Sequence, residues 1–187
     1  MTVFAAIAAT AAERSASLPG DQIVARPDVV MDRGFCLPAP PQAVWPWIVQ
    51  LGKARSGWYL PRRAERWMPE RRRALRRLDP RWQALAVGDV IPDWGGRRAT
   101  FQVAVMIPPA ALVYRSVRGA TNLSWAIILT PAGTAATRLH LRLRLGPVRR
   151  QRLAATAGDL VDRLTIAGLA AGLRERLTPA RSPDQAC

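Results

Sequence analysis

Residues 136–145 read Ala-Thr-Arg-Leu-His-Leu-Arg-Leu-Arg-Leu, so that from Arg138 onward every second residue is a leucine. Successive side chains of a β-strand point to opposite faces of the sheet, so this stretch predicts a strand with one buried and one solvated face. We expect the leucines to face the interior and the basic residues to face water: Leu139, Leu141, Leu143 and Leu145 against Arg138, His140, Arg142 and Arg144.

Five more β-rich runs precede this strand and are separated by turns that contain proline or glycine. A helix should begin near Pro40 or Pro41, because proline in the first helical turn costs no hydrogen bond. Its apolar residues, Val44, Trp45, Ile48 and Leu51, fall at helical spacing. The other expected strands are Val29–Leu37, Gly88–Pro92, Thr100–Ile107, Ala111–Val117 and Asn122–Thr130.

The last expected element is a long helix from about Arg150 to Leu177. A one-sided antiparallel sheet must bury its apolar face, and only this helix is long enough to cover it. The order of elements therefore predicts an α+β helix-grip fold, a curved antiparallel sheet wrapped around a long C-terminal helix. Gly168 and Gly172 lie inside the helix, where each costs about 0.8–1 kcal/mol relative to alanine. Close approach of the helix to the sheet, or room for a ligand, would compensate this cost.

The length of 187 residues and a hydrophobic content of 49% predict one domain with a core. We expect an N-terminal extension over residues 1–24, as a short helix or disordered, the domain over 25–177, and a disordered tail over 178–187. Two distant cysteines, Cys36 and Cys187, favour a reduced, cytoplasmic chain without a disulfide framework. No window holds 18 unbroken apolar residues, so no membrane span is expected.

A strongly basic segment runs from residue 61 to residue 81 and contains nine arginines against three acids. We expect a helical insertion anchored by Trp67, Leu75 and Leu78, with the arginines in solvent. The net charge of +15 favours an anionic partner. Nucleic acid, anionic lipid and an acidic protein remain open, and arginine without lysine also follows from a GC-rich genome. Any affinity for polyanions is expected to be non-specific.

The residue inventory argues against several kinds of catalytic site. One histidine, two distant cysteines and no clustered carboxylates leave a zinc site or a Ser-His-Asp arrangement without its parts. The run Gly95-Gly96-Arg97-Arg98 lacks the ending of a phosphate loop and is interpreted as a hairpin turn. We therefore predict no catalytic residues, no metal and no cofactor, and leave open whether the protein is an enzyme.

Several motifs resemble the START-like helix-grip superfamily, also labelled SRPBCC or polyketide cyclase/dehydrase-like. They are VVMDR (29–33), APPQAVWPWIVQLG (39–52), GWY (57–59), VGDVIP (87–92) and SWA (124–126), and the resemblance covers roughly residues 25–175. It implies a cavity between the sheet and the last helix. The superfamily includes lipid carriers and aromatase/cyclases, so it implies a ligand class better than an activity. Basic residues replace the Tyr-Asp and acidic helix that close relatives tend to carry after Gly-Trp-Tyr.

Within that resemblance, aromatic residues are the candidates for holding a small hydrophobic or amphipathic molecule. Ordinary core packing is the alternative for the same residues. If the protein is cyclase-like, Tyr59, Tyr114 or a buried arginine orients a substrate carbonyl. The competing function is a non-catalytic interaction protein whose Arg-rich surface binds an acidic partner or nucleic acid; the oligomeric state is left open. The predicted ligand-binding residues are Trp58, Tyr59, Trp94, Phe101, Tyr114, Trp125, Leu164 and Gly168.

Overall fold

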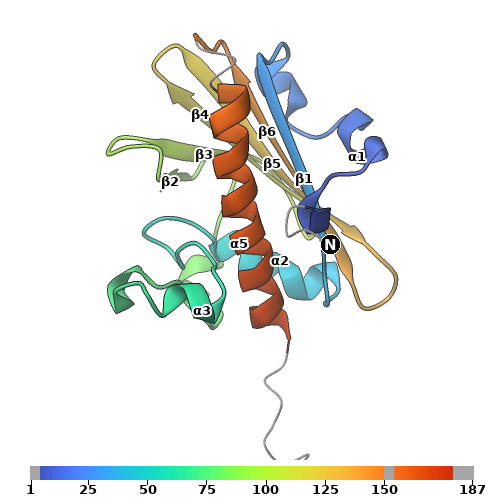
Figure 1. Ribbon diagram of the computed structural model, residues 1–187, viewed down its shortest axis with the longest axis vertical. Coiled ribbons are helices and arrows are strands. Elements are labelled where there is room, and N and C mark those ends of the chain that lie inside the picture. Colours follow the sequence, from blue (N-terminus) through green and yellow to red (C-terminus); the bar gives the residue numbers. More distant parts are fainter. Residues whose placement is uncertain (1–4, 150–153, 179–187) are drawn as a thin grey trace, which may run out of the picture.

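The computed structural model describes residues 5–149 and 154–178. In these residues one antiparallel sheet has the strand order β1-β6-β5-β4-β3-β2, and the long helix α5 crosses one of its faces (Figure 1). The α+β helix-grip fold is thus confirmed. The strands are β1 (Val29–Leu37), β2 (Val90–Pro92), β3 (Thr100–Ile107), β4 (Ala111–Arg118), β5 (Thr121–Pro131) and β6 (Thr137–Gly146).

Two helices pack on the inner face of the sheet, α2 (Pro41–Gln50) and α5 (Asp159–Leu177). The helix α2 begins at Pro41, as the sequence predicts, and continues through Pro46 as one element. A π-helical turn, η5 (Ala154–Gly158), precedes α5. The expected start of this helix at 150–153 and the expected tail at 179–187 lie outside the described residues.

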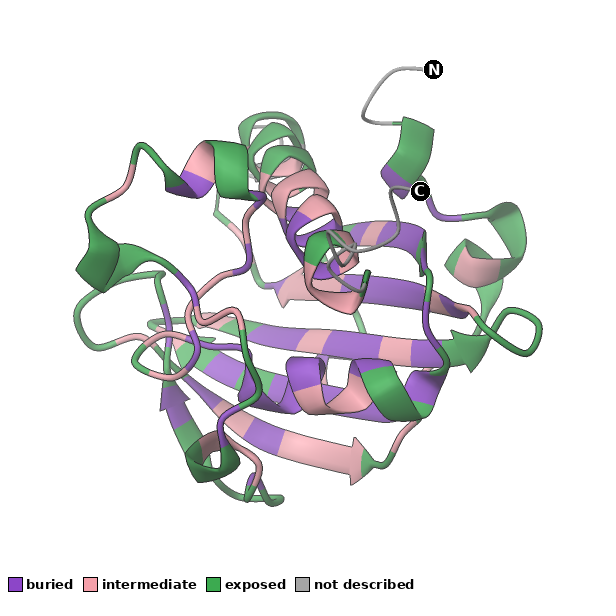
Figure 2. Cartoon of the chain, turned by 90° about the horizontal axis from the view of Figure 1, so that it is seen from below, coloured by how far each residue is buried: buried purple, intermediate pink, exposed green. Residues whose placement is uncertain are grey.

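The inner face holds the core that the leucine alternation predicts. Leu139 and Leu141 are buried beneath α5, where they meet Leu169 and Leu173 of the helix. From α2, Val44 and the next helical turn join the same cluster. Figure 2 shows buried residues on the central strands and on both helices. The leucine half of the alternation is therefore confirmed.

The outer face of the sheet differs from its prediction. His140 and Arg142 are 5% and 3% exposed, so they do not face water. They are covered by the N-terminal segment, residues 5–24, which contains η1 (Ala5–Ile7), α1 (Ala11–Ser15) and η2 (Asp21–Val24). The segment passes along β1, where Ala8 pairs with Arg33, and then turns over the outer face. Burial of the two basic residues is possible because Asp32 of β1 is a partner of both and the segment brings further acceptors to Arg142.

Arg142 is the centre of this buried network. Its Nε donates to Asp32 Oδ1 at 2.8 Å, and His140 Nε2 lies 2.7 Å from the same oxygen. Its Nη1 and Nη2 donate to backbone carbonyls of the N-terminal segment and to Asp21, so the guanidinium fixes the segment on the sheet. Arg138 forms a second tie, an ion pair with Glu13 of α1.

The basic segment does not form the expected single helix. It contains a four-residue helix, α3 (Arg62–Glu65), and two 3-10 turns, η3 (Glu70–Arg72) and η4 (Pro80–Trp82). Trp67 and Leu78 were expected to anchor the segment, but they are 79% and 43% exposed and do not. Prolines at 61, 69 and 80 each start a new short turn, and this interrupts the helical pattern.

Contacts with α5 hold the basic segment in place instead. Glu65 is buried and accepts from both Arg76 and Arg176, and Arg176 also lies over the Tyr59 ring. The helix approaches this region closely at Gly172, where a Cβ atom would lie 2.6–2.7 Å from backbone atoms of Tyr59 and Leu60. The helix glycine thus permits close approach to residues 59–60, rather than to the sheet.

Candidate ligand-binding site

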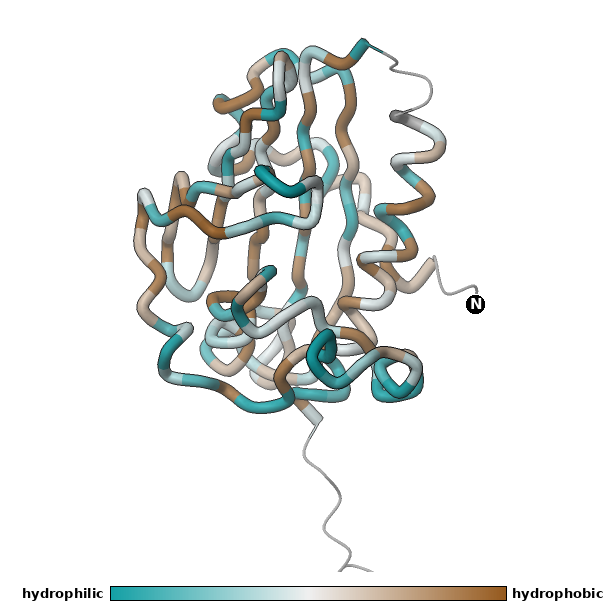
Figure 3. The backbone as a smooth tube through the Cα atoms, turned by 90° about the vertical axis from the view of Figure 1, so that its left-hand side faces the viewer, coloured by the Kyte–Doolittle hydropathy of each residue, from teal (hydrophilic) through white to brown (hydrophobic). Residues whose placement is uncertain are grey.

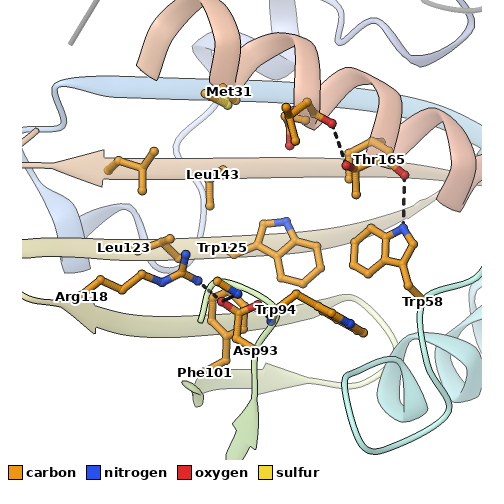
Figure 4. A pocket seen from close by; sticks show the side chains of 16 residues that line it. Met31, Trp58, Asp93, Trp94, Phe101, Arg118, Leu123, Trp125, Leu143 and Thr165 are labelled. Atoms are coloured by element: carbon orange, nitrogen blue, oxygen red, sulfur yellow. Dashed lines mark hydrogen bonds and ion pairs between the residues drawn. The ribbon is translucent and has the colours of Figure 1, made fainter. Parts of the chain in front are cut away.

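A cavity of about 480 Å³ lies between the sheet and the N-terminal half of α5 (Figure 4). This volume is within the range typical of small-molecule sites. Its floor is formed by inner-face side chains of β1, β3, β5 and β6, and its roof by α5 and the end of η5. The lining residues are Met31, Trp58, Asp93, Trp94, Gly95, Phe101, Arg118, Leu123, Trp125, Leu143, Leu145, Gly158, Val161, Asp162, Thr165 and Ile166.

One wall of the cavity is aromatic. The Trp58 and Trp94 rings meet edge to face at 5.5 Å, and Trp58 and Trp125 lie 6.1 Å apart with their planes inclined by only 25°. Phe101 extends the row at 5.8 Å from Trp125. Trp58 is tied to the roof, because its indole Nε1 donates to the Thr165 carbonyl of α5 (Figure 4). The wall therefore presents several π-faces whose positions depend on the docked helix.

A charged pair occupies the side of the cavity next to the loop after β2. Arg118 at the end of β4 donates to Asp93, and the Asp93 carboxylate also accepts from the backbone amides of Trp94 and Gly95. These bonds fix the loop that carries Trp94. The Nε of Arg118 is buried without a hydrogen-bond partner among the described residues. Arg118 thus brings a positive charge, with one donor unpaired, to the border of a mainly apolar cavity.

A second acid, Asp162, lines the roof of the cavity. Its Oδ2 lies 2.9 Å from Arg33 Nε, although the pair is not aligned as a hydrogen bond. Burial raises the pKa of Asp162, and the charge of Arg33 offsets only part of that rise. One turn earlier, burial also acts to raise the pKa of Asp159, but hydrogen bonds and charge from Arg33 and Arg163 outweigh it and lower the pKa. Arg33 therefore ties β1 to the roof.

The structure brings four of the eight predicted residues to the cavity: Trp58, Trp94, Phe101 and Trp125. Tyr59 is fully buried elsewhere, with its hydroxyl donating to the Trp47 carbonyl. Tyr114 lies behind Trp125, with ring centroids 5.9 Å apart. Leu164 points outward and is 57% exposed, and Gly168 faces Leu60. These four do not line the cavity.

Several lining residues escaped the sequence prediction. Leu143 and Leu145 belong to the inner face that the alternation identifies, so their place near a cavity could have been found by following β6 past the core leucines. Arg118 and Asp162 carry no local signal. They meet the cavity only because the sheet register and the docking of α5 place them there.

No group of acidic, histidine or cysteine side chains with metal-binding arrangement occurs within residues 5–149 and 154–178. Over the same residues, none of the helices combines the length and apolar character needed to cross a bilayer. Cys36, on β1, is exposed.

Comparison with known proteins supports the fold. No family model matches the chain, and no curated protein matches it in sequence. Among solved structures, protein MLL2253 from Mesorhizobium loti is similar, with 19% identity and a TM-score of 0.51 over 79% of this chain and 98% of that one. Protein CV1439 from Chromobacterium violaceum has 16% identity and a TM-score of 0.50 over 81% and 98%. Protein Ms6760 from Mycobacterium smegmatis has 11% identity and a TM-score of 0.50 over 83% and 94%. These likenesses show a shared fold.

Proposed function

We propose that this protein is a START-like binding protein that holds one small hydrophobic or amphipathic molecule in the cavity beneath α5. The observation that carries the proposal is an aromatic wall beside empty volume, where a packed core would fill the space. The cavity of about 480 Å³ is open to solvent and mostly apolar in its lining, which is the usual character of a small-molecule site.

The lining supports a ligand with a flat apolar body and one polar end. Rings of Trp58, Trp94 and Trp125 offer faces and edges for stacking with a planar or extended apolar group. At one side the Arg118–Asp93 pair forms a polar border, and the positive charge of Arg118 suits a carbonyl or carboxylate oxygen. Such a molecule would bury its apolar surface and still satisfy its oxygen.

Binding is favoured over the cyclase-like chemistry that the superfamily also includes. In the cyclase hypothesis, tyrosine hydroxyls orient a substrate carbonyl, but the Tyr59 hydroxyl is already bonded to Trp47 and Ser56. Tyr114 is buried behind Trp125, and burial raises its pKa well above the ordinary value. The charged groups that line the cavity, Arg118, Asp93 and Asp162, are paired with one another or with Arg33, which suits binding as well as catalysis.

A neutral solvatochromic dye tests the proposal. Nile red is preferable to an anionic dye, because the net charge of +15 would attract anions to the surface. We expect saturable binding with one site, a blue-shifted dye emission and quenching of indole fluorescence. Native mass spectrometry of protein purified from its source organism should also detect a bound small molecule. Absence of both saturable dye binding and a co-purified molecule would reject the proposal.

Two variants assign that binding to the cavity. Gly158→Leu introduces a side chain beside Met31 at the cavity wall, where even a Cβ would lie 3.2 Å from the methionine methyl carbon. It should abolish Nile red binding without loss of stability, since leucine favours helix over glycine. Trp125→Ala should weaken binding, whereas Trp67→Ala removes an exposed indole far from the cavity and should leave it unchanged. Equal binding by Gly158→Leu and the parent protein would show that the dye sits elsewhere.

A further inference from the structure

One surface of the basic segment combines positive charge with an exposed indole. We call residues 61–73, which include α3 and η3, the basic lobe. Its six arginines are exposed: Arg62, Arg63, Arg66, Arg71, Arg72 and Arg73. The lobe has one exposed acid, Glu70, because Glu65 is buried between Arg76 and Arg176. The lobe therefore carries a strong local excess of positive charge.

Trp67 lies within this charge and is 79% exposed. Its ring is contacted by the guanidinium of Arg66, 5.0 Å from the ring centroid. An indole that packs against the domain would contribute to folding, but Trp67 has nearly its whole surface in solvent. Its position is therefore explained better by a partner than by the fold.

Further apolar side chains are exposed in the loop after β2 and on the N-terminal half of α5. Trp94 is 50% exposed in the loop after β2, next to the exposed Arg97 and Arg98. Leu160, Val161 and Leu164 are 51–62% exposed on α5. The basic lobe and this loop both lie on the left of Figure 1, the side that faces the viewer in Figure 3. Because Val161 and Trp94 also line the cavity, the cavity opens between these exposed residues.

We propose that this side of the protein docks on an anionic lipid bilayer. The lobe arginines would lie against lipid phosphates, and Trp67 would enter the headgroup layer, where amphipathic indole rings are favoured. Trp94 and Val161, which both line the cavity, would contact the same interface. This docking does not depend on whether the cavity holds a ligand.

Lipid suits this surface better than nucleic acid. Arginines alone would fit either polyanion, but a phosphate backbone offers nothing to an exposed apolar side chain such as Val161, which lines the cavity together with Trp94. The exposed apolar residues therefore favour the membrane.

Vesicle sedimentation tests this docking. The full chain is mixed with phosphatidylcholine vesicles, with or without phosphatidylglycerol, at rising salt. We expect binding only to the anionic vesicles, with an affinity that falls as salt screens the charges. Brominated lipids should quench indole fluorescence of the parent protein more than that of Trp67→Ala.

Matched charge variants separate the contribution of the lobe arginines to vesicle binding from that of the overall net charge. The lobe variant carries Arg63→Gln, Arg71→Gln and Arg72→Gln, and the control carries Arg14→Gln, Arg26→Gln and Arg115→Gln. All six arginines are exposed, and each variant has a net charge of 15 − 3 = +12. The control set lies on α1, on the turn between η2 and β1, and on β4. At roughly fivefold per arginine, the lobe variant should lose on the order of a hundredfold in vesicle affinity. The control should lose far less.

Removal of the Trp67 indole is the second test of membrane docking. Trp67→Ala should weaken vesicle binding by roughly tenfold, the effect of removing one large apolar side chain from the interface. Both Trp67→Ala and the lobe variant should still bind Nile red, so failure here is distinguishable from failure of the cavity proposal. Equal losses in the lobe and control variants, or vesicle binding that is indifferent to Trp67, would overturn the docking. Stronger binding to RNA or DNA than to anionic vesicles would also overturn it, in favour of nucleic acid.

Discussion

The two faces of the sheet are covered in opposite ways. On the inner face, leucines of β6 meet α5, and part of the interface is left as an open cavity lined by indoles. On the outer face, Arg142 and His140 are sealed beneath the N-terminal segment by Asp32, Asp21 and backbone carbonyls. The inner face is mainly apolar and incompletely filled, whereas the outer face is joined by a buried network of charged side chains. The proposed ligand site therefore lies on the apolar face, and the charged network holds the N-terminal segment on the other.

The largest expected loss of stability comes from removing the central arginine of the outer face. Arg142→Ala removes five hydrogen bonds and leaves Asp32 and Asp21 without this counter-charge beneath the N-terminal segment. Removing one partner of a buried ion pair costs about 3–5 kcal/mol. Urea denaturation should show this loss at an unchanged m-value. The exposed Arg115→Ala on β4 is the control and should cost less than about 1 kcal/mol. Similar stabilities for the two variants would mean that the N-terminal segment is not held by this network.

This outer face also shows where sequence reasoning stops. Alternation in β6 identifies which side chains share a face, because that depends only on the local strand. What covers each face depends on segments distant in sequence, and nothing in residues 5–24 marks them as a cover for basic residues. The strands were predicted to within two residues, since their patterns are local. The basic lobe was not, since its path follows contacts of Glu65 and Arg176 that only the folded chain brings together.

The aromatic residues of the cavity teach the same lesson. Trp125 and Tyr114 are cross-strand partners on β5 and β4, so both were reasonable candidates. The depth of each ring decides which one lines the cavity. Trp125 borders the cavity, and the Tyr114 ring is stacked behind Trp125. Residue type identified the aromatic wall, but not which rings stand at its surface.

The next prediction compares two leucines of one strand on the inner face. Leu139 is fully buried in the core, so Leu139→Ala should cost about 2–5 kcal/mol through lost burial and a new void. Leu143 borders the cavity and is only half-buried, so Leu143→Ala adds to space that already exists. Its cost should be clearly lower, at about 1–2 kcal/mol. Equal costs, measured by urea denaturation, would imply that the volume beneath α5 is filled in solution.

A smaller effect is expected at the glycines of α5. At Gly172 an added Cβ would collide with backbone of residues 59–60, which cannot move aside as a side chain would. Overpacking at Gly172→Ala should therefore lower the free energy of unfolding by about 1–3 kcal/mol. The better helix propensity of alanine should offset up to about 1 kcal/mol of that loss. At Gly168 the obstacle is the end of the flexible Leu60 side chain, so Gly168→Ala should be near neutral. Thermal unfolding of both variants tests the contrast, and a stabilised Gly172→Ala would show that α5 stands further from Tyr59.

The smallest effect concerns acid and the N-terminal segment. The hydrogen bond from Arg138 is the main cause that lowers the pKa of Glu13 from 4.5 to about 2. Because the folded-state pKa lies below the unfolded one, this pair stabilises the fold above about pH 4.5. The stabilisation is then lost as the pH falls toward 2. Glu13→Gln should lower stability slightly at pH 7 and reduce its decline between pH 4.5 and 2, as measured by urea denaturation across that range. Glu70→Gln, an exposed acid on the basic lobe, is the control and should keep the parent profile. If Glu13→Gln also keeps that profile, α1 is not held to the sheet by its Arg138 pair, and Arg142 and Arg144 are the main ties of the outer face.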